Sequence, residues 1–195
     1  MNPELNTNDE SVLIENIKRQ DRASFDALVN LYRQMGLNIA YNLVGNFEDA
    51  KDVLQDAFIK VYLNINDFQE RSKFLTWFYR IVVNCSLDFL RKRKRMGKIF
   101  TATLTDEDGK EGELQIPDDS LNPRRLALAN ELGRKLEDCI VRLSEKQRIC
   151  FVLKHQNGLR IQEITKILKC SPGTVKVHLF RAIENLRQAL SNYLE

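Results

Sequence analysis

Apolar residues recur along this chain at intervals of three and four, the spacing of one face of an α-helix. In the first half, three such stripes cover residues 25–39, 54–65 and 74–89, and a shorter one covers residues 13–17. No segment alternates apolar and polar residues for more than a few positions, as a half-buried strand would. Gly45 and Asn46 separate the first two long stripes. The pattern predicts a bundle of three or four helices.

The last third of the chain has the same helical period, with stripes over residues 126–143, 149–153, 161–168 and 175–190. Ser144 and Gln147 are spaced for a capping box, and Gly158 suits the left-handed end of a helix. Ser171 followed by Pro172 is a typical helix start. A short helix, a tight turn and a long capped helix predict a helix-turn-helix.

Between these two helical parts the sequence becomes acidic and loses its apolar period. Residues 96–123 carry 2 basic and 7 acidic side chains, a composition that favours a flexible linker. The sequence therefore predicts an all-α fold of two small helical domains, residues 8–95 and 124–195, joined by this linker. The second domain carries 14 basic and 7 acidic side chains, which indicates a polyanionic partner.

Composition excludes several function classes. The chain of 195 residues is 43% hydrophobic and 29% charged, and its longest apolar run is Ile149 to Leu153. The polar amino terminus has no signal-peptide pattern, so we expect a cytoplasmic protein. The four cysteines lack metal or redox spacing and are expected to be buried, reduced thiols. With two histidines and no catalytic or phosphate-loop motif, we expect no enzyme activity, no metal and no cofactor.

The third predicted helix carries features typical of nucleic-acid binding. It ends in five adjacent cations, residues 91–95, which phosphates would neutralise. Its start brings aromatic residues next to Lys73, and aromatic rings beside cations can stack unpaired bases. We expect most of these rings to be core, with the loop of residues 66–72 as the best base-capturing edge. A solvated helix end is the alternative for the basic run.

Two other surfaces are candidates for binding. Asp49, Asp52, Gln55 and Asp56 make a polar, acidic face near the start of the second predicted helix, which indicates either favourable helix-dipole placement or a basic protein partner. The amino-terminal half of the last helix has the position of a major-groove recognition helix, since Lys and Arg there can donate to guanine. The alternative is a plain helical hairpin with a solvated basic face.

Three segments carry a resemblance to a known family. They are residues 48–58 (EDAKDVLQDAF), 74–84 (FLTWFYRIVVN) and 171–182 (SPGTVKVHLFRA). In this order and spacing the sequence resembles the extracytoplasmic-function (ECF) sigma factors of the bacterial sigma-70 family, over about residues 8–95 and 124–192. The resemblance implies a promoter-specificity subunit of RNA polymerase that recognises a duplex −35 element and an opened −10 strand.

The resemblance also implies roles for individual residues. It implies that the coiled coil of the polymerase β′ subunit is contacted by Asp49, Asp52, Gln55 and Asp56. Contacts with −10 DNA fall to Lys73, Trp77, Arg80, Asn84, Arg91, Lys92 and Arg93. Contacts with −35 DNA fall to Arg160, Ser171, Thr174, Lys176, Val177, His178 and Arg181. Phe180 lies on the same helix but is also a candidate core residue. Arg160, Val177 and His178 depart from the residues that the family often has at those positions.

The implied partners are core RNA polymerase through its β′ and β subunits, promoter DNA and an anti-sigma factor, with the chain itself monomeric. One alternative is a helix-turn-helix repressor or activator with a helical sensor or dimerisation domain. An RNA-binding or structural helical adaptor is another. The acidic helix face and the run of cations are unexplained by the repressor, and the capped recognition helix is unexplained by the adaptor.

Overall fold

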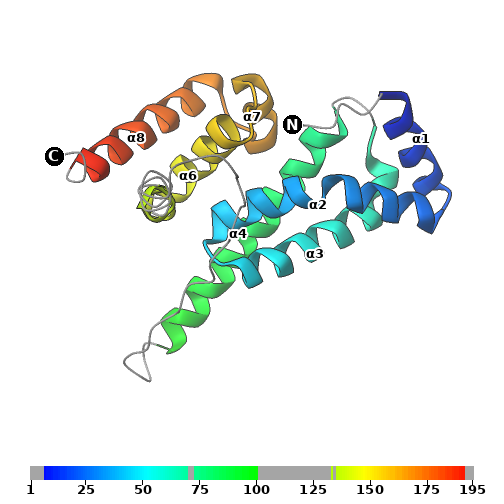
Figure 1. The fold of residues 1–195 in the computed structure, drawn as a ribbon, viewed down its shortest axis with the longest axis horizontal. Coiled ribbons are helices and arrows are strands. Elements are labelled where there is room, and N and C mark those ends of the chain that lie inside the picture. Colours follow the sequence, from blue (N-terminus) through cyan, green and yellow to red (C-terminus); the bar gives the residue numbers. More distant parts are fainter. Residues whose placement is uncertain (1–6, 70–72, 101–132, 134, 192–195) are drawn as a thin grey trace, which may run out of the picture.

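The computed structural model describes residues 7–69, 73–100, 133 and 135–191, and all regular structure in this part of the chain is helical. In the first domain the helices are α1 (Thr7–Lys18), α2 (Arg22–Val44), α3 (Phe47–Asn64), a 3₁₀ turn η1 (Ile65–Asp67) and α4 (Phe74–Phe100). Helices α2, α3 and α4 pack on one another, and α1 packs on α2 (Figure 1). The predicted helical bundle is confirmed.

The ends of these helices follow local chemistry. Gly45 ends α2 in the left-handed conformation at φ +78°, which a residue without a Cβ adopts at little cost. The Asn46 side chain then accepts a hydrogen bond from the Asp49 amide at 3.1 Å and begins α3. Helix α4 continues to Phe100, so residues 96–100 are helical where we placed the start of the linker. The rest of that linker lies outside the described residues.

The second domain contains a helical stretch at residues 135–142, α6 (Glu145–Phe151), a π-helical turn η2 (Val152–Gln156), α7 (Ile161–Leu168) and α8 (Pro172–Ser191). Helix α6 begins after Ser144 as expected, but the predicted capping box does not form. The Gln147 side chain instead accepts a hydrogen bond from Asn185 of α8 at 3.1 Å. A tertiary partner therefore replaces the local one.

The helix-turn-helix is α7 and α8. Lys169 ends α7 in the left-handed conformation, and the Ser171 hydroxyl accepts from the Thr174 amide at 3.2 Å to begin α8. At the start of α7, Arg160 cannot supply a capping oxygen. The Glu163 carboxylate accepts a hydrogen bond from the Arg160 amide at 2.7 Å, which satisfies one of the backbone amides at this end of the helix.

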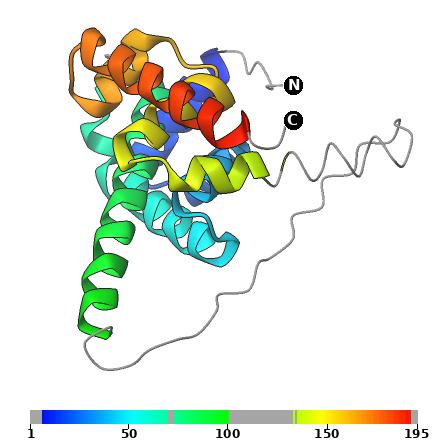
Figure 2. The ribbon, with the colours of Figure 1, turned by 90° about the vertical axis from the view of Figure 1, so that its left-hand side faces the viewer.

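The two domains are in direct contact. Helix α4 packs against α7, and α2 packs against η2, so one hydrophobic core runs through both domains (Figure 2). In both views the carboxyl-terminal end of α4 extends past the other helices. Helix α4 is buried on more than its aromatic face, because Tyr79 is 3% exposed and Val83 1% exposed. Burial raises the pKa of Tyr79 to about 12.

The cysteines are all free thiols, as expected, but only two of them are buried. Cys85 and Cys150 are buried, whereas Cys139 and Cys170 are half-buried. Burial raises the pKa of Cys150 to about 12, which keeps this thiol protonated at neutral pH. No helix in the described ranges is both long enough and apolar enough to cross a membrane.

The crossing of α2 with α3 and α4 depends on Gly36. A Cβ at this position would lie 2.5 Å from Leu54 Cδ1 and 2.7 Å from Phe78 Cζ. We expect Gly36→Ala to lower the free energy of unfolding by about 1–2 kcal/mol, because overpacking outweighs the better helix propensity of alanine. Urea unfolding measures this change. Gly173→Ala is the control, since its nearest neighbour atom is 3.7 Å away, and it should leave stability unchanged or slightly raised. Equal stability of the two variants would contradict the close approach.

Candidate nucleic-acid interface

The acidic face of α3 points away from the core. Ala50, Val53, Leu54 and Ala57 are buried on one side of the helix, and the predicted contact residues lie on the other. Asp52, Gln55 and Asp56 are exposed, and none of them forms a hydrogen bond or ion pair with another residue in the described part of the chain. Three polar side chains on adjacent turns are therefore available to a partner.

Asp49, the fourth residue predicted on this face, is engaged within the protein. It is half-buried, and its carboxylate lies 3.2 Å from Arg93 Nη1. Arg93 also lies over the ring of Phe89, with its guanidinium carbon 5.9 Å from the ring centroid. The structure thus joins a residue predicted to bind polymerase to one predicted to bind DNA, which sequence spacing does not indicate because 44 positions separate them.

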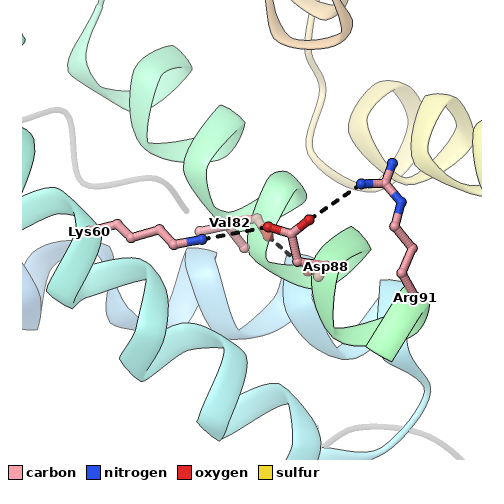
Figure 3. Close-up of polar contacts among 5 residues, drawn as sticks. Lys60, Val82, Asp88 and Arg91 are labelled. Atoms are coloured by element: carbon pink, nitrogen blue, oxygen red, sulfur yellow. Dashed lines mark hydrogen bonds and ion pairs between the residues drawn. The ribbon is translucent and has the colours of Figure 1, made fainter. Parts of the chain in front are cut away.

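A second ion-pair group ties α3 to α4. The Asp88 carboxylate lies 3.7 Å from Lys60 Nζ of α3 and 3.3 Å from Arg91 Nη1 (Figure 3). Arg91 is thereby held along the helix one turn after Asp88. Lys92 is exposed on the same turn. The predicted run of cations begins on this anchored helix and continues along its extended end.

The aromatic cluster at the start of α4 is mostly core, as expected. Phe68, Phe74, Phe78 and Tyr79 are each at most 5% exposed. Trp77 is half-buried, and its ring lies 5.3 Å from that of Phe68. Of the predicted base-capturing loop, Phe68 therefore belongs to the core, and residues 70–72 lie outside the described residues.

The polar residues predicted to contact −10 DNA are distributed along α4. Lys73 is exposed just before the helix, Arg80 is half-buried and Asn84 is exposed. Thr76, one turn before Arg80 on the same helix, is only 9% exposed. The accessible positions are therefore Lys73, Trp77 at one edge, Arg80 and Asn84, followed by the cations of the next turns.

The predicted −35 residues, apart from Arg160, lie at the cap and in the first half of α8, the second helix of the helix-turn-helix. Lys176, Val177 and Arg181 are exposed on α8, opposite its buried residues Val175, Leu179, Ala182 and Leu186. Arg160 is exposed just before α7. Ser171 and Thr174 are also exposed, but they are joined to each other through the helix cap, with their hydroxyl oxygens 2.9 Å apart. Their first role is thus structural.

His178 lies half-buried on the same helix. Its pKa is lowered from the ordinary value first by burial and then by Lys146 of α6 and Arg181. The ring is therefore neutral at pH 7 and offers one donor and one acceptor nitrogen.

Helix α8 also exposes apolar side chains. Val177 is 47% exposed, Phe180 is 67% exposed and Ile183 is 40% exposed, at steps of three residues. Phe180 is therefore a surface residue. Within the apolar stripe predicted over residues 175–190, Ala182 is buried and the adjacent Ile183 is not. A helical period identifies a stripe but not which of two adjacent residues faces its centre.

Comparisons with known proteins agree with this geometry. The model of sigma-70 region 2 matches residues 28–96, and the model of sigma-70 region 4 matches residues 133–186. The ECF RNA polymerase sigma factor SigW of Bacillus subtilis is 34% identical over 91% of this chain and 94% of its own length. The RNA polymerase sigma-H factor of Pseudomonas aeruginosa is 33% identical over 93% of this chain and 94% of its own length.

A solved structure has a similar fold. It is the sigma factor RpoE of Bartonella quintana in complex with the anti-sigma factor NepR, with a TM-score of 0.67 at 20% identity. The match covers 86% of this chain and 96% of that one. The region 2 match thus covers all of α3 and most of α2 and α4, and the region 4 match covers α6, α7 and most of α8. This chain belongs to the ECF RNA polymerase sigma factors of the sigma-70 family.

Proposed function

We propose that this chain binds core RNA polymerase through the exposed face of α3 and recognises promoter DNA with both domains. The observation that carries the proposal is the pairing of two surfaces in one chain. One is an acidic face that exposes Asp52 and Asp56, and the other is a capped helix-turn-helix that exposes Lys176 and Arg181. Nothing in the comparisons favours a ligand-sensing repressor.

The first domain supplies the −10 contacts in this proposal. Asn84 and Arg80 present hydrogen-bonding groups to an unpaired strand, Trp77 offers a ring edge, and Lys73 with Arg91, Lys92 and Arg93 contacts phosphates. Capture of a flipped base offsets an unstacking cost of a few kcal/mol. The chain itself makes and breaks no bond, so its contribution is binding and melting rather than catalysis.

The second domain supplies the −35 contacts. The amino-terminal half of α8 enters the major groove, where Lys176 and Arg181 donate to base edges or phosphates and the exposed Val177 meets a thymine methyl group. Arg160 contacts the phosphate backbone beside the groove. The neutral imidazole of His178 contributes a hydrogen bond rather than a charge.

Simultaneous recognition of both elements requires the two domains to separate. Elements centred 25 base pairs apart are about 85 Å apart along B-DNA at about 3.4 Å per base pair. In this structure α4 and α7 are packed together. We therefore assign the described arrangement to the free chain and propose that polymerase binding parts the domains. The RpoE complex with NepR supports an anti-sigma factor as a further partner of this chain.

The polymerase face is tested by charge reversal. We expect the double variant Asp52→Lys with Asp56→Lys to bind core polymerase at least about tenfold more weakly, because like charges then face a basic partner. Fluorescence anisotropy of labelled protein titrated with core enzyme measures this affinity. The matched control reverses Glu15 and Asp26, two exposed acids on α1 and α2, and should bind normally. Unchanged binding of the Asp52 and Asp56 variant would exclude this face.

The recognition helix is tested by removing single cations. We expect Lys176→Ala and Arg181→Ala each to reduce −35-dependent initiation by about tenfold, since a good base contact contributes about 1–3 kcal/mol. Run-off transcription with core enzyme on a promoter selected from genomic fragments measures the effect, and core binding should persist. Arg187→Ala removes an exposed cation from the same helix, one that pairs with Glu184 at 3.4 Å. Equal loss in all three variants would argue against a recognition role.

A further inference from the structure

A surface cavity of about 400 Å³, largely open to solvent, lies between the two domains at the junction of α4 and α6. Its lining residues are Leu90, Arg91, Arg93, Lys94, Glu145 and Arg148. Four of the six side chains are cationic and one is anionic. The volume falls within the range of cavities that hold small ligands. The excess of positive charge selects an anion.

Arg148 is the central group of this cavity. It is only 7% exposed, and its Nη1 donates to the carbonyl oxygen of Val141 at 3.0 Å. Its Nε is buried and has no hydrogen-bond partner among the residues that the structure describes. A buried guanidinium with an unsatisfied donor is costly unless an anion or another acceptor joins it. Burial, and then Arg93, lower the pKa of Arg148, while Glu145 raises it.

The other cations of the cavity are partly or wholly uncompensated. Arg91 is paired with Asp88 and Arg93 with the half-buried Asp49, and both arginines are exposed, so these ion pairs exchange readily. Lys94 is exposed and forms no ion pair with any residue that the structure describes. Glu145 is the one carboxylate that lines the cavity. The acids nearby therefore do not balance the four cations.

We propose that this cavity binds a small anion that carries a diphosphate group, such as pyrophosphate or a nucleoside triphosphate. Arginine guanidiniums donate paired hydrogen bonds to phosphate oxygens, and Lys94 adds a point charge. Arg148 lines the cavity from α6, but its Nε is buried and is not a contact for a bound anion in this arrangement. A diphosphate places several acceptor oxygens within reach of cations on both α4 and α6.

The ligand would bridge the domains. Arg91, Arg93 and Lys94 belong to the first domain, and Arg148 belongs to the second. The cavity is complete only when the domains are packed together, so bound anion stabilises that arrangement by mass action. This inference goes beyond promoter recognition, and its test needs neither polymerase nor DNA.

Isothermal titration calorimetry of the full chain tests the site with two probes, pyrophosphate and ATP, in separate titrations without divalent metal and at constant ionic strength. We expect 1:1 binding of at least pyrophosphate. Lys94→Gln should weaken it about tenfold, the effect of losing one charge-assisted contact. Arg95→Gln removes the neighbouring exposed cation, which does not line the cavity, and should change the affinity less than about twofold.

A second variant, Arg148→Met, tests the buried group, with circular dichroism to verify its fold. If the folded variant loses pyrophosphate binding, the assignment is supported. The proposal is overturned if neither probe binds saturably. It is also overturned if Arg95→Gln weakens binding as much as Lys94→Gln, which would mark a general polyanion surface. Because Lys94 is exposed, its variant decides the matter even if Arg148→Met fails to fold.

Discussion

The burial of α4 on more than one side is the constraint on which the rest of the structure depends. Phe78 is fully buried and packs with Tyr32, Phe58 and Phe74, where the missing side chain of Gly36 lets α2 approach. Tyr79 and Val83 are also buried on a helix that packs against α7 of the second domain. Asn84, Arg80 and the following cations are therefore displayed from a helix that α2 and α3 of the same domain hold in place. A rigid support of this kind fixes the spacing of the groups that would meet an unpaired strand.

The ion pairs around α4 partly neutralise its cations but leave them exposed to solvent. Asp88 and Asp49 compensate Arg91 and Arg93, yet all four side chains retain at least 31% exposure, so each pair contributes at most about 1 kcal/mol. Phosphates can therefore replace these carboxylates at little cost. The Asp49–Arg93 pair has a further consequence, because one partner lies on the proposed polymerase face and the other in the proposed DNA-binding run. If Asp49 contacts polymerase and Arg93 contacts DNA as proposed, release of either residue from the pair would free the other, and the two binding events would favour each other.

The helices and their ends could be predicted from the sequence, whereas contacts between residues far apart in the chain could not. The stripes identified the helices, and Gly45, Asn46, Gly158 and Ser171 marked their ends, because these positions depend on neighbouring residues alone. The capping box at Ser144 failed because Gln147 found a partner 38 positions away. Ile183 and Phe180 were ambiguous because periodicity does not say which residue at a stripe edge is covered. The polar roles on α3, α4 and α8 came from the resemblance, whereas the Asp49–Arg93 pair and the cavity at Arg148 required the fold.

The contact between the domains combines a favourable apolar term with an unfavourable electrostatic one. Ile164 and Ile167 are buried on α7, which packs against α4, and the core is continuous across the boundary. Close to this packing, Arg148 of one domain meets the positive field of Arg93 from the other, and the Arg148 Nε lacks an acceptor in the described part of the chain. Like charges on the two sides of the boundary repel each other, so the contact between the domains is less stable than its apolar burial alone would make it. That balance agrees with the proposal that the domains pack together in the free chain and part to span two DNA elements. An anion in the cavity would remove the repulsion and favour the packed form.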